Sequence, residues 1–246
     1  MNIALLGYGK MGQIIERFAT ERGHDIVLKI GIENLEDFTR ENLEKADVAI
    51  DFSAPNTAVS NIYKCFEAGV PVVVGTTGWY GNLQQIKNDC LKGNNTLLYG
   101  SNFSVGVNLF FHLNKMLAKL MNNYPAYEVQ VEEIHHTQKL DSPSGTAMTI
   151  AEDIIDAVSR KSEWVNEVVG NPMPEAFKSE QLLIESYRME NVPGTHTVVY
   201  SSEVDEIEIK HTAHNRAGFA LGAVIAAEWL ENKQGFYSVA DVFNFG

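Results

Sequence analysis

The chain has 246 residues, of which 45% are hydrophobic, and this is enough apolar material for one large domain or two smaller ones. Its formal net charge of −13 argues against nucleic acid as a partner, because such a surface repels phosphates. The longest apolar run is too short to span a bilayer, and the N-terminal segment lacks the basic leader of a secretory signal. We therefore expect a cytoplasmic protein without a membrane partner.

The two cysteines lie far apart in the chain. Cys65 and Cys90 have no C-x-x-C spacing, so the sequence indicates neither a zinc site nor a disulfide framework. We expect both to be buried, unreactive thiols, and we predict no metal site.

The first predicted strand covers residues 2–6 and runs directly into Gly7-Tyr8-Gly9-Lys10-Met11-Gly12. Apolar residues then recur at helical spacing, so the segment is predicted to be strand, glycine turn and helix. Gly7 and Gly9 let the backbone turn sharply and approach a pyrophosphate, while Gly12 lets the helix pack closely against the strand. This arrangement predicts a dinucleotide site.

The second strand, residues 26–30, should end at an acid that binds the ribose hydroxyls. Gly31 stands at this tip, and Glu33 follows two residues later. Glu33 could reach the ribose and favour NADH, or the missing acid could leave room for the 2′-phosphate of NADPH, with Lys10 or Lys29 nearby. We expect dual use of NADH and NADPH, with neither preferred by more than about tenfold, or roughly 1.4 kcal/mol.

Three further strands, over residues 46–53, 70–74 and 96–99, alternate with helices over 57–68 and 83–90. Such alternation predicts a parallel, doubly wound sheet whose ligand lies at the carboxyl ends of the strands.

Small residues follow one of these strands. Gly75, Thr76 and Thr77 stand where the nicotinamide half of the cofactor should pass. The alternative is that this loop only ends a strand.

The densest polar cluster follows a helix over residues 109–120 and an alternating strand that begins near Tyr127. Pro143 and Gly145 exclude a helix through the middle of this cluster, while Ser144 or Thr146 can cap the apolar segment that follows. The exposed N–H groups of a helix start suit a carboxylate or phosphate, and Lys139 adds positive charge. The cluster predicts an anion site.

The run from Glu133 to Ala147 resembles the signature of dihydrodipicolinate reductase, E-x-H-H-x-x-K-x-D-x-P-S-G-T-A, and meets every fixed position. The resemblance implies reduction of 4-hydroxy-tetrahydrodipicolinate (dihydrodipicolinate) to tetrahydrodipicolinate by NAD(P)H, in the diaminopimelate route of lysine biosynthesis. It also implies that His135 is the general acid/base and Lys139 a proton donor. The residues that it assigns to the small dicarboxylate substrate are His136, Ser144, Gly145 and Thr146.

Other segments resemble the family in the same order. Residues 100–108 are similar to A-x-N-F-S-x-G-V-x, where the family contacts the nicotinamide and enters the second domain. Residues 188–196 are similar to R-x-G-x-x-x-G-x-H, although Glu190 replaces a common glycine, and residues 209–223 are similar to I-x-H-x-A-x-x-R-x-x-F-A-x-G-A. The predicted cofactor-binding residues are Gly7, Tyr8, Gly9, Lys10, Met11, Gly12, Glu33, Gly75, Thr76, Thr77, Gly100, Ser101, Asn102, Phe103 and Arg216.

These features predict an α/β protein with a Rossmann-type domain over residues 1–104 and 215–246. Residues 105–214 are predicted to form an α+β domain for substrate binding and oligomerisation, with an open mixed sheet. Within it, residues 159–180 are polar and predict a surface excursion, whereas 181–186, 195–202 and 204–211 alternate and predict antiparallel strands. By resemblance to the family we expect a homotetramer.

Two other functions compete with the reductase. Another two-domain NAD(P)-dependent dehydrogenase would share the first half, but has no reason to carry H-H-x-x-K with S-G-T. A regulatory or catalytically silent homologue that only binds NAD(P) would be free to lose His135 and Lys139, and both are present.

Overall fold

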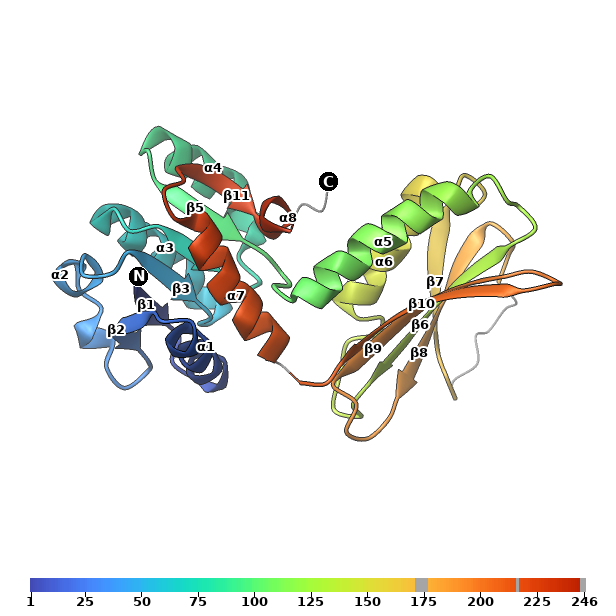
Figure 1. The fold of residues 1–246 in the computed structure, drawn as a ribbon, viewed down its shortest axis with the longest axis horizontal. Helices are drawn as coiled ribbons and strands as arrows, with labels where there is room; N and C mark the ends of the chain where they lie inside the picture. Colours follow the sequence, from blue (N-terminus) through green and yellow to red (C-terminus); the bar gives the residue numbers. More distant parts are fainter. Residues whose placement is uncertain (171–176, 216, 244–246) are drawn as a thin grey trace. The chain divides into compact units, whose positions relative to one another are not determined.

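The computed structural model describes residues 1–170, 177–215 and 217–243. The chain divides into two compact units, the first formed by residues 1–105 and 216–246 and the second by residues 106–215. Each unit is built on its own β-sheet, as Figure 1 shows.

The first unit contains a six-stranded parallel sheet in the order β11-β5-β4-β3-β1-β2. Its strands are β1 (Asn2–Leu6), β2 (Asp25–Ile30), β3 (Val48–Asp51), β4 (Val72–Val74), β5 (Thr96–Tyr99) and β11 (Gly235–Ser238). Its helices are α1 (Lys10–Glu21), α2 (Arg40–Leu43), α3 (Pro55–Ala68), α4 (Leu83–Lys92), α7 (Ala217–Leu230) and α8 (Val239–Val242), with short 3₁₀ turns η1 (Leu35–Asp37) and η2 (Tyr80–Asn82).

Helices cover both faces of this sheet. Successive side chains of a strand point to opposite faces, so Ile3 and Leu5 of β1 pack with α1 and α7, whereas Ala4 and Leu6 pack with α3 and α4. The prediction of a doubly wound parallel sheet is confirmed. The sequence reading missed β11, which adds a parallel strand beside β5.

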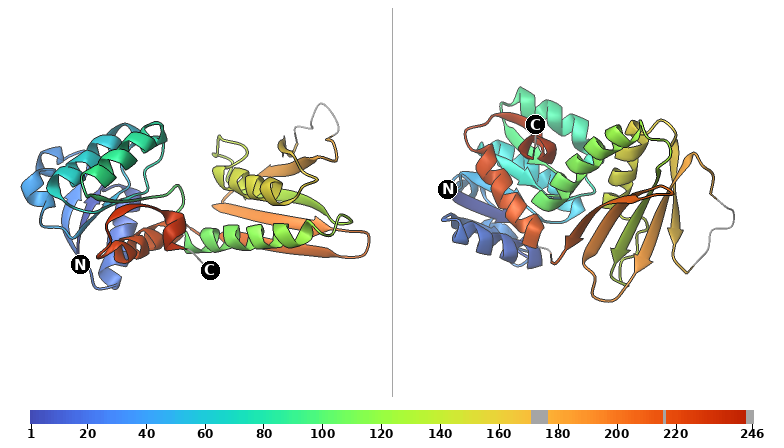
Figure 2. Two further views of the ribbon diagram at one scale, coloured as in Figure 1. Left: turned by 90° about the horizontal axis from the view of Figure 1, so that it is seen from above. Right: turned by 45° about the vertical axis from the view of Figure 1, so that its right-hand side comes forward.

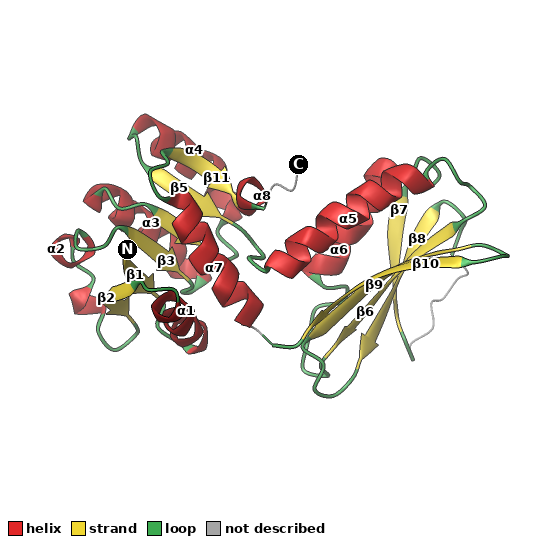
Figure 3. Cartoon of the chain, viewed as in Figure 1, coloured by secondary structure: helices red, strands yellow, loops and turns green. Residues whose placement is uncertain are grey.

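The second unit contains a five-stranded sheet in the order β10-β9-β6-β8-β7. Its strands are β6 (Glu128–His135), β7 (Glu163–Val168), β8 (Gln181–Arg188), β9 (Gly194–Ser201) and β10 (Glu206–Ala213), and its helices are α5 (Val105–Met121) and α6 (Gly145–Ala157). Both helices lie on one face of the sheet, as Figures 2 and 3 show. We call the face under the helices the inner face and the opposite one the outer face.

Two details of the second sheet differ from the sequence reading. The alternating pattern predicts that β8 is antiparallel to its neighbours, but it runs parallel to both β6 and β7. The segment 159–180 was expected to be a surface excursion, but residues 163–168 form β7, an edge strand, while residues 171–176 lie outside the described part. Alternating apolar residues indicate a half-buried strand but carry no information on its direction.

Both cysteines are buried, as expected. Among the described residues, no helix combines the length and the apolar character that a membrane span requires.

Candidate active site

The centre of the site is the carboxyl end of β6. Val129 and Val131 of this strand point into the apolar core on the inner face, and residues two apart in a strand share a face. Glu133 and His135 therefore continue the same row, and both are buried. The inner face changes along the strand from an apolar core to a polar cluster.

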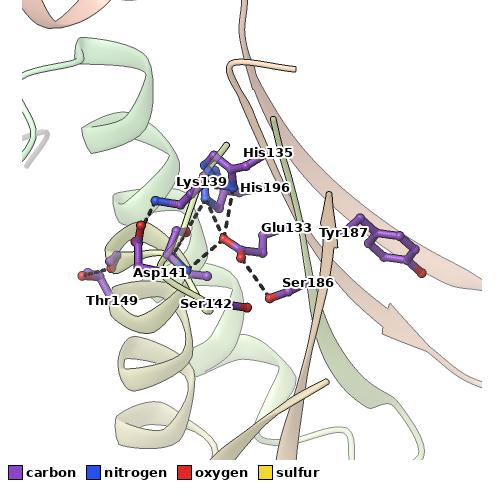
Figure 4. Close-up of polar contacts among 12 residues, drawn as sticks. Glu133, His135, Lys139, Asp141, Ser142, Thr149, Ser186, Tyr187 and His196 are labelled. Carbon is purple, nitrogen blue, oxygen red and sulfur yellow. Dashed lines mark hydrogen bonds and ion pairs between the residues drawn. The ribbon is translucent and has the colours of Figure 1, made fainter. Parts of the chain in front are cut away.

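The neighbouring strands change in the same way and at the same level. In the strand register, Glu133 stands opposite Ser186 of β8 and His196 of β9, while His135 stands opposite Arg188 of β8. Figure 4 shows Glu133, His135, Ser186 and His196 gathered on one side of the sheet, with Tyr187 pointing away from them. The register of three strands thus assembles a site from residues far apart in the chain.

The Glu133 carboxylate, with a side chain that is 0% exposed, is the hub of this cluster. Its Oε2 accepts a hydrogen bond from the Ser144 N–H at 3.0 Å and lies 3.3 Å from His135 Nδ1, and its Oε1 accepts from Ser186 Oγ at 2.9 Å. Burial by itself raises the pKa of Glu133, but the nearby His135 imidazole and the hydrogen bonds from Ser144 and Ser186 outweigh it, and the pKa lies below its usual range. Glu133 is therefore ionised.

Arg188 neutralises this buried charge. Its two terminal nitrogens lie 3.2 and 3.3 Å from Glu133 Oε1, and one of them also donates to the Asp141 carbonyl at 2.8 Å. Arg188 therefore links the carboxylate to the loop that carries Lys139. Glu133, His135 and His196 also offer ligand atoms within 4.8 Å of one another, but the guanidinium beside the carboxylate disfavours a second cation there.

His196 connects β9 to the start of α6 through a contact with Ser144. Its Nε2 lies 3.0 Å from Ser144 Oγ, which also accepts from the Ala147 N–H at 3.2 Å and so caps the helix. Burial lowers the pKa of His196 to about 3, and a proton on neighbouring His135 would act in the same direction. His196 is therefore a neutral imidazole that fixes the position of Ser144.

The cationic part of the site lies on the loop before α6. Lys139 Nζ is 2.7 Å from a carboxylate oxygen of Asp141, whose side chain is 64% exposed. Gly145 and Thr146, which begin α6, are exposed and half-buried, so their N–H groups belong to the positive end of the helix. His136 is half-buried and directly follows β6. The loop carries an imidazole, an ammonium and a helix start, which suit an anionic ligand.

The glycine turn of the first unit fits a dinucleotide. A Cβ on Gly7 would lie 2.2 Å from the Phe52 carbonyl oxygen, and one on Gly12 would lie 2.6 Å from the Gly7 carbonyl oxygen, so both positions need glycine. A Cβ on Gly9 would meet nothing within 4 Å, and Gly9 as N-cap supplies no side-chain acceptor to the first turn of α1. The turn therefore leaves backbone N–H groups beside open space, as a pyrophosphate requires.

The loop after β4 is held by a buried carboxylate. Asp51, at the end of β3, accepts hydrogen bonds from Thr76 Oγ1 at 2.6 Å, from Ser53 Oγ at 2.7 Å and from Asn61 Nδ2 at 2.8 Å. The Thr76 side chain is thus committed to Asp51. Gly75 packs against the Phe52 ring, where a Cβ would lie 2.2 Å from Cζ.

The remaining predicted cofactor residues of the first unit have varied surroundings. Tyr8 donates a short hydrogen bond to Glu16, and Phe103 lies in the core with 1% exposure. Thr77, Lys10, Ser101 and Glu33 are exposed, Met11 and Asn102 are half-buried, and Gly100 is buried. Arg216 lies outside the described residues.

Comparison with known families covers both units. The family model described as dihydrodipicolinate reductase, N-terminus, matches residues 1–103, and the one described as dihydrodipicolinate reductase, C-terminus, matches residues 106–243. The chain belongs to the dihydrodipicolinate reductase family.

Individual relatives agree with this assignment. The chain is 49% identical to the 4-hydroxy-tetrahydrodipicolinate reductase of Christiangramia forsetii over 244 residues, 99% of this chain and 98% of the relative. It is 34% identical to the enzyme of the same name from Methanosarcina barkeri, with 98% of each chain covered. The dipicolinate-bound dihydrodipicolinate reductase of Paenisporosarcina sp. TG-14 shares the fold with a TM-score of 0.75 at 22% identity, with 98% of each chain covered.

The sequence pattern assigns no role to four members of this cluster. They are Glu133, Ser186, Arg188 and His196. The signal that could have found them is polar side chains in inward-facing strand positions, because buried charges require partners.

Proposed function

We propose that the protein reduces 4-hydroxy-tetrahydrodipicolinate to tetrahydrodipicolinate with NADH or NADPH, in the diaminopimelate route of lysine biosynthesis. A hydride and a proton enter the substrate, and water leaves. The main support is that the complete signature from Glu133 to Ala147 forms a strand end, a loop and a helix start that together carry an imidazole, an ammonium and exposed N–H groups.

We assign roles to the residues of this loop by their chemistry. The reduced nicotinamide supplies the hydride when it is bound. His135 serves as the general acid/base, and Lys139 donates a proton and attracts a substrate carboxylate. Asp141 holds the Lys139 ammonium, so a substrate carboxylate can exchange with it. We assign the helix start from Ser144 to Thr146, together with His136, to substrate carboxylate binding.

Oxidation of reduced cofactor tests this function. The purified protein is mixed with NADH or NADPH, with and without a dihydrodipicolinate synthase reaction that generates the substrate in place. Cofactor oxidation should require the synthase mixture. A protein that binds the cofactor but does not oxidise it in the full mixture would be the silent homologue instead.

Cofactor choice gives a separate prediction. Glu33 is exposed beyond the tip of β2, while Lys29, which could have met a 2′-phosphate, is paired with Glu16 at 2.6 Å. A carboxylate at residue 33 repels a phosphate dianion, so Glu33→Ala should shift the ratio of the two kcat/KM values toward NADPH. Steady-state kinetics with both cofactors measure the ratio. Glu36→Ala, another exposed acid nearby, is the control; an unchanged ratio in Glu33→Ala would make Glu33 a bystander.

We also propose a homotetramer formed through the outer face of the second sheet. Leu183 of β8 and Val199 of β9 point to this face. Neither belongs to the core clusters, although neighbouring side chains leave them only 8% and 7% exposed. An open sheet must cover its faces and protect its edges. Light scattering should give four times the 27.3 kDa mass of one chain.

Substitution of the outer face tests this assembly. Val199→Lys, once circular dichroism shows that it is folded, should give smaller species, because an unpaired charge in an interface is costly. Val27→Lys, in the first unit, should leave the mass unchanged. A monomer at micromolar concentration would refute the tetramer.

We further propose a cytoplasmic location. Both cysteines are free, as is usual where cellular reductants keep thiols reduced.

A further inference from the structure

We propose that Glu133 is the positioning residue of His135: it holds the imidazole with its proton on Nδ1 and so leaves Nε2 as the nitrogen that takes part in the reaction. This inference rests on the proposed function, because it explains how the acid/base residue is prepared for its role. Glu133 contacts no reacting atom in this account and acts through His135.

The contact of His135 Nδ1 with Glu133 indicates which tautomer the imidazole adopts. His135 Nδ1 lies 3.3 Å from Glu133 Oε2 and has no aligned hydrogen-bond partner among the described residues. An ionised carboxylate accepts hydrogen bonds but cannot donate one. At this separation the carboxylate oxygen favours the neutral tautomer with the proton on Nδ1, because a lone pair on Nδ1 would face the negative charge, and the lone pair is then on Nε2.

The rest of the cluster fixes the orientation of the carboxylate. Arg188 and Ser186 hold Oε1, and the N–H of Ser144 holds Oε2 on the side of His135. The carboxylate, which β6 carries, is therefore anchored from two other elements, β8 and the start of α6. Such anchoring from several sides is what a positioning residue requires.

Gly194 gives independent evidence that His135 Nε2 is the nitrogen left free for the reaction. A Cβ built at this first residue of β9 would lie 3.0 Å from His135 Nε2 and 3.3 Å from its Cδ2. A methyl group there would crowd this edge of the imidazole. The glycine therefore keeps space beside Nε2, while Nδ1 faces the buried carboxylate.

The anchoring predicts the effect of Glu133→Gln. Arg188 directs two N–H groups at the Oε1 position, so the amide oxygen of the new glutamine should occupy that position. Its NH₂ group then faces His135 Nδ1 and donates to it, and the hydrogen bond that Oε2 accepts from the Ser144 N–H is lost. The substitution should therefore move the histidine proton from Nδ1 to Nε2 with little change in shape, and a histidine in the wrong tautomer loses up to about 10⁴-fold in rate in serine proteases.

The test is ¹⁵N NMR of the full-length protein with labelled histidine, in alkaline buffer, with the His135 signals assigned by their loss in His135→Asn. The wild type should show the proton on Nδ1, and Glu133→Gln should show it on Nε2. In Glu133→Gln, kcat should fall between about 10²- and 10⁴-fold, with KM changed much less. Glu152→Gln, an exposed acid on α6, should match the wild type in both measurements.

The wild-type spectrum decides the inference even where Glu133→Gln fails to fold, because a proton on Nε2 in the wild type would overturn it. An unchanged tautomer in a folded Glu133→Gln would overturn it as well.

Gly194→Ala is the second variant. It should keep the proton on Nδ1 but lower kcat/KM at least tenfold, whereas Gly81→Ala, whose Cβ meets nothing within 4 Å, should have no effect. Full activity in Gly194→Ala would contradict the role of Nε2.

If the wild type does not oxidise NAD(P)H, the proposed function fails, but the NMR result still decides whether Glu133 sets the tautomer.

Discussion

Lys139→Ala should lower kcat by about 10²–10⁴-fold, the range that general acid/base groups typically contribute. The Lys139 ammonium is the charge that we assign to proton donation and to a substrate carboxylate. The Lys139 side chain is 19% exposed and that of its partner Asp141 is 64% exposed, so water reaches this ion pair from the Asp141 side and its loss should leave the protein folded. Steady-state kinetics measure the loss, and fluorescence titration with NADPH measures cofactor affinity.

Cofactor affinity is the informative control. Lys139 belongs to the second unit, whereas the glycine turn belongs to the first. The dissociation constant for NADPH should therefore remain close to that of the wild type. Lys119→Ala, an exposed lysine of α5 in the same unit, should keep full activity. An equal loss of NADPH binding in Lys139→Ala would contradict the assignment of Lys139 to the substrate.

Gly222→Ala should destabilise the first unit severely. A Cβ on this residue of α7 would lie 1.6 Å from the Phe103 carbonyl oxygen and 2.7 Å from its carbon, and both are backbone atoms that cannot rotate away. Overpacking typically costs about 1–3 kcal/mol and occasionally more. At about 3 kcal/mol the melting temperature falls by roughly 6–12 °C, which calorimetry or circular dichroism can follow.

The same helix provides a matched control. Gly218→Ala adds the same methyl group to α7, but its Cβ would lie 3.3 Å from the Ser104 hydroxyl, a side-chain atom. Both substitutions gain the helix propensity of alanine, about 1 kcal/mol. Gly218→Ala should therefore leave the melting temperature unchanged or slightly raised. Equal melting temperatures for the two variants would refute the close contact between α7 and Phe103.

The first sheet was predictable because its signals are local. The glycine turn after β1 and the alternation of strands with helices specify a parallel sheet covered on both sides. The direction of β8 was not predictable, because it depends on which strand β8 meets. β7 was missed because only Trp164, Val165 and Val168 interrupt a polar stretch, and edge strands bury little surface.

The site was predictable in part. The loop from His135 to Thr146 could be recognised because its residues are contiguous in the chain. The support beneath it could not, because Glu133 is 53 residues from Ser186 and 55 from Arg188. Only the strand register brings these side chains together. The sequence does show that Glu133 shares a face with Val129 and Val131, so its burial could have been inferred, but its partners could not.

Transfer of deuterium from the cofactor tests the central claim most directly. The protein is supplied with NADH that carries deuterium at C4 of the nicotinamide, in the position that is transferred, together with the product of dihydrodipicolinate synthase. Mass spectrometry should detect tetrahydrodipicolinate that carries one deuterium. Absence of this product, or product without deuterium, would contradict reduction by direct hydride transfer.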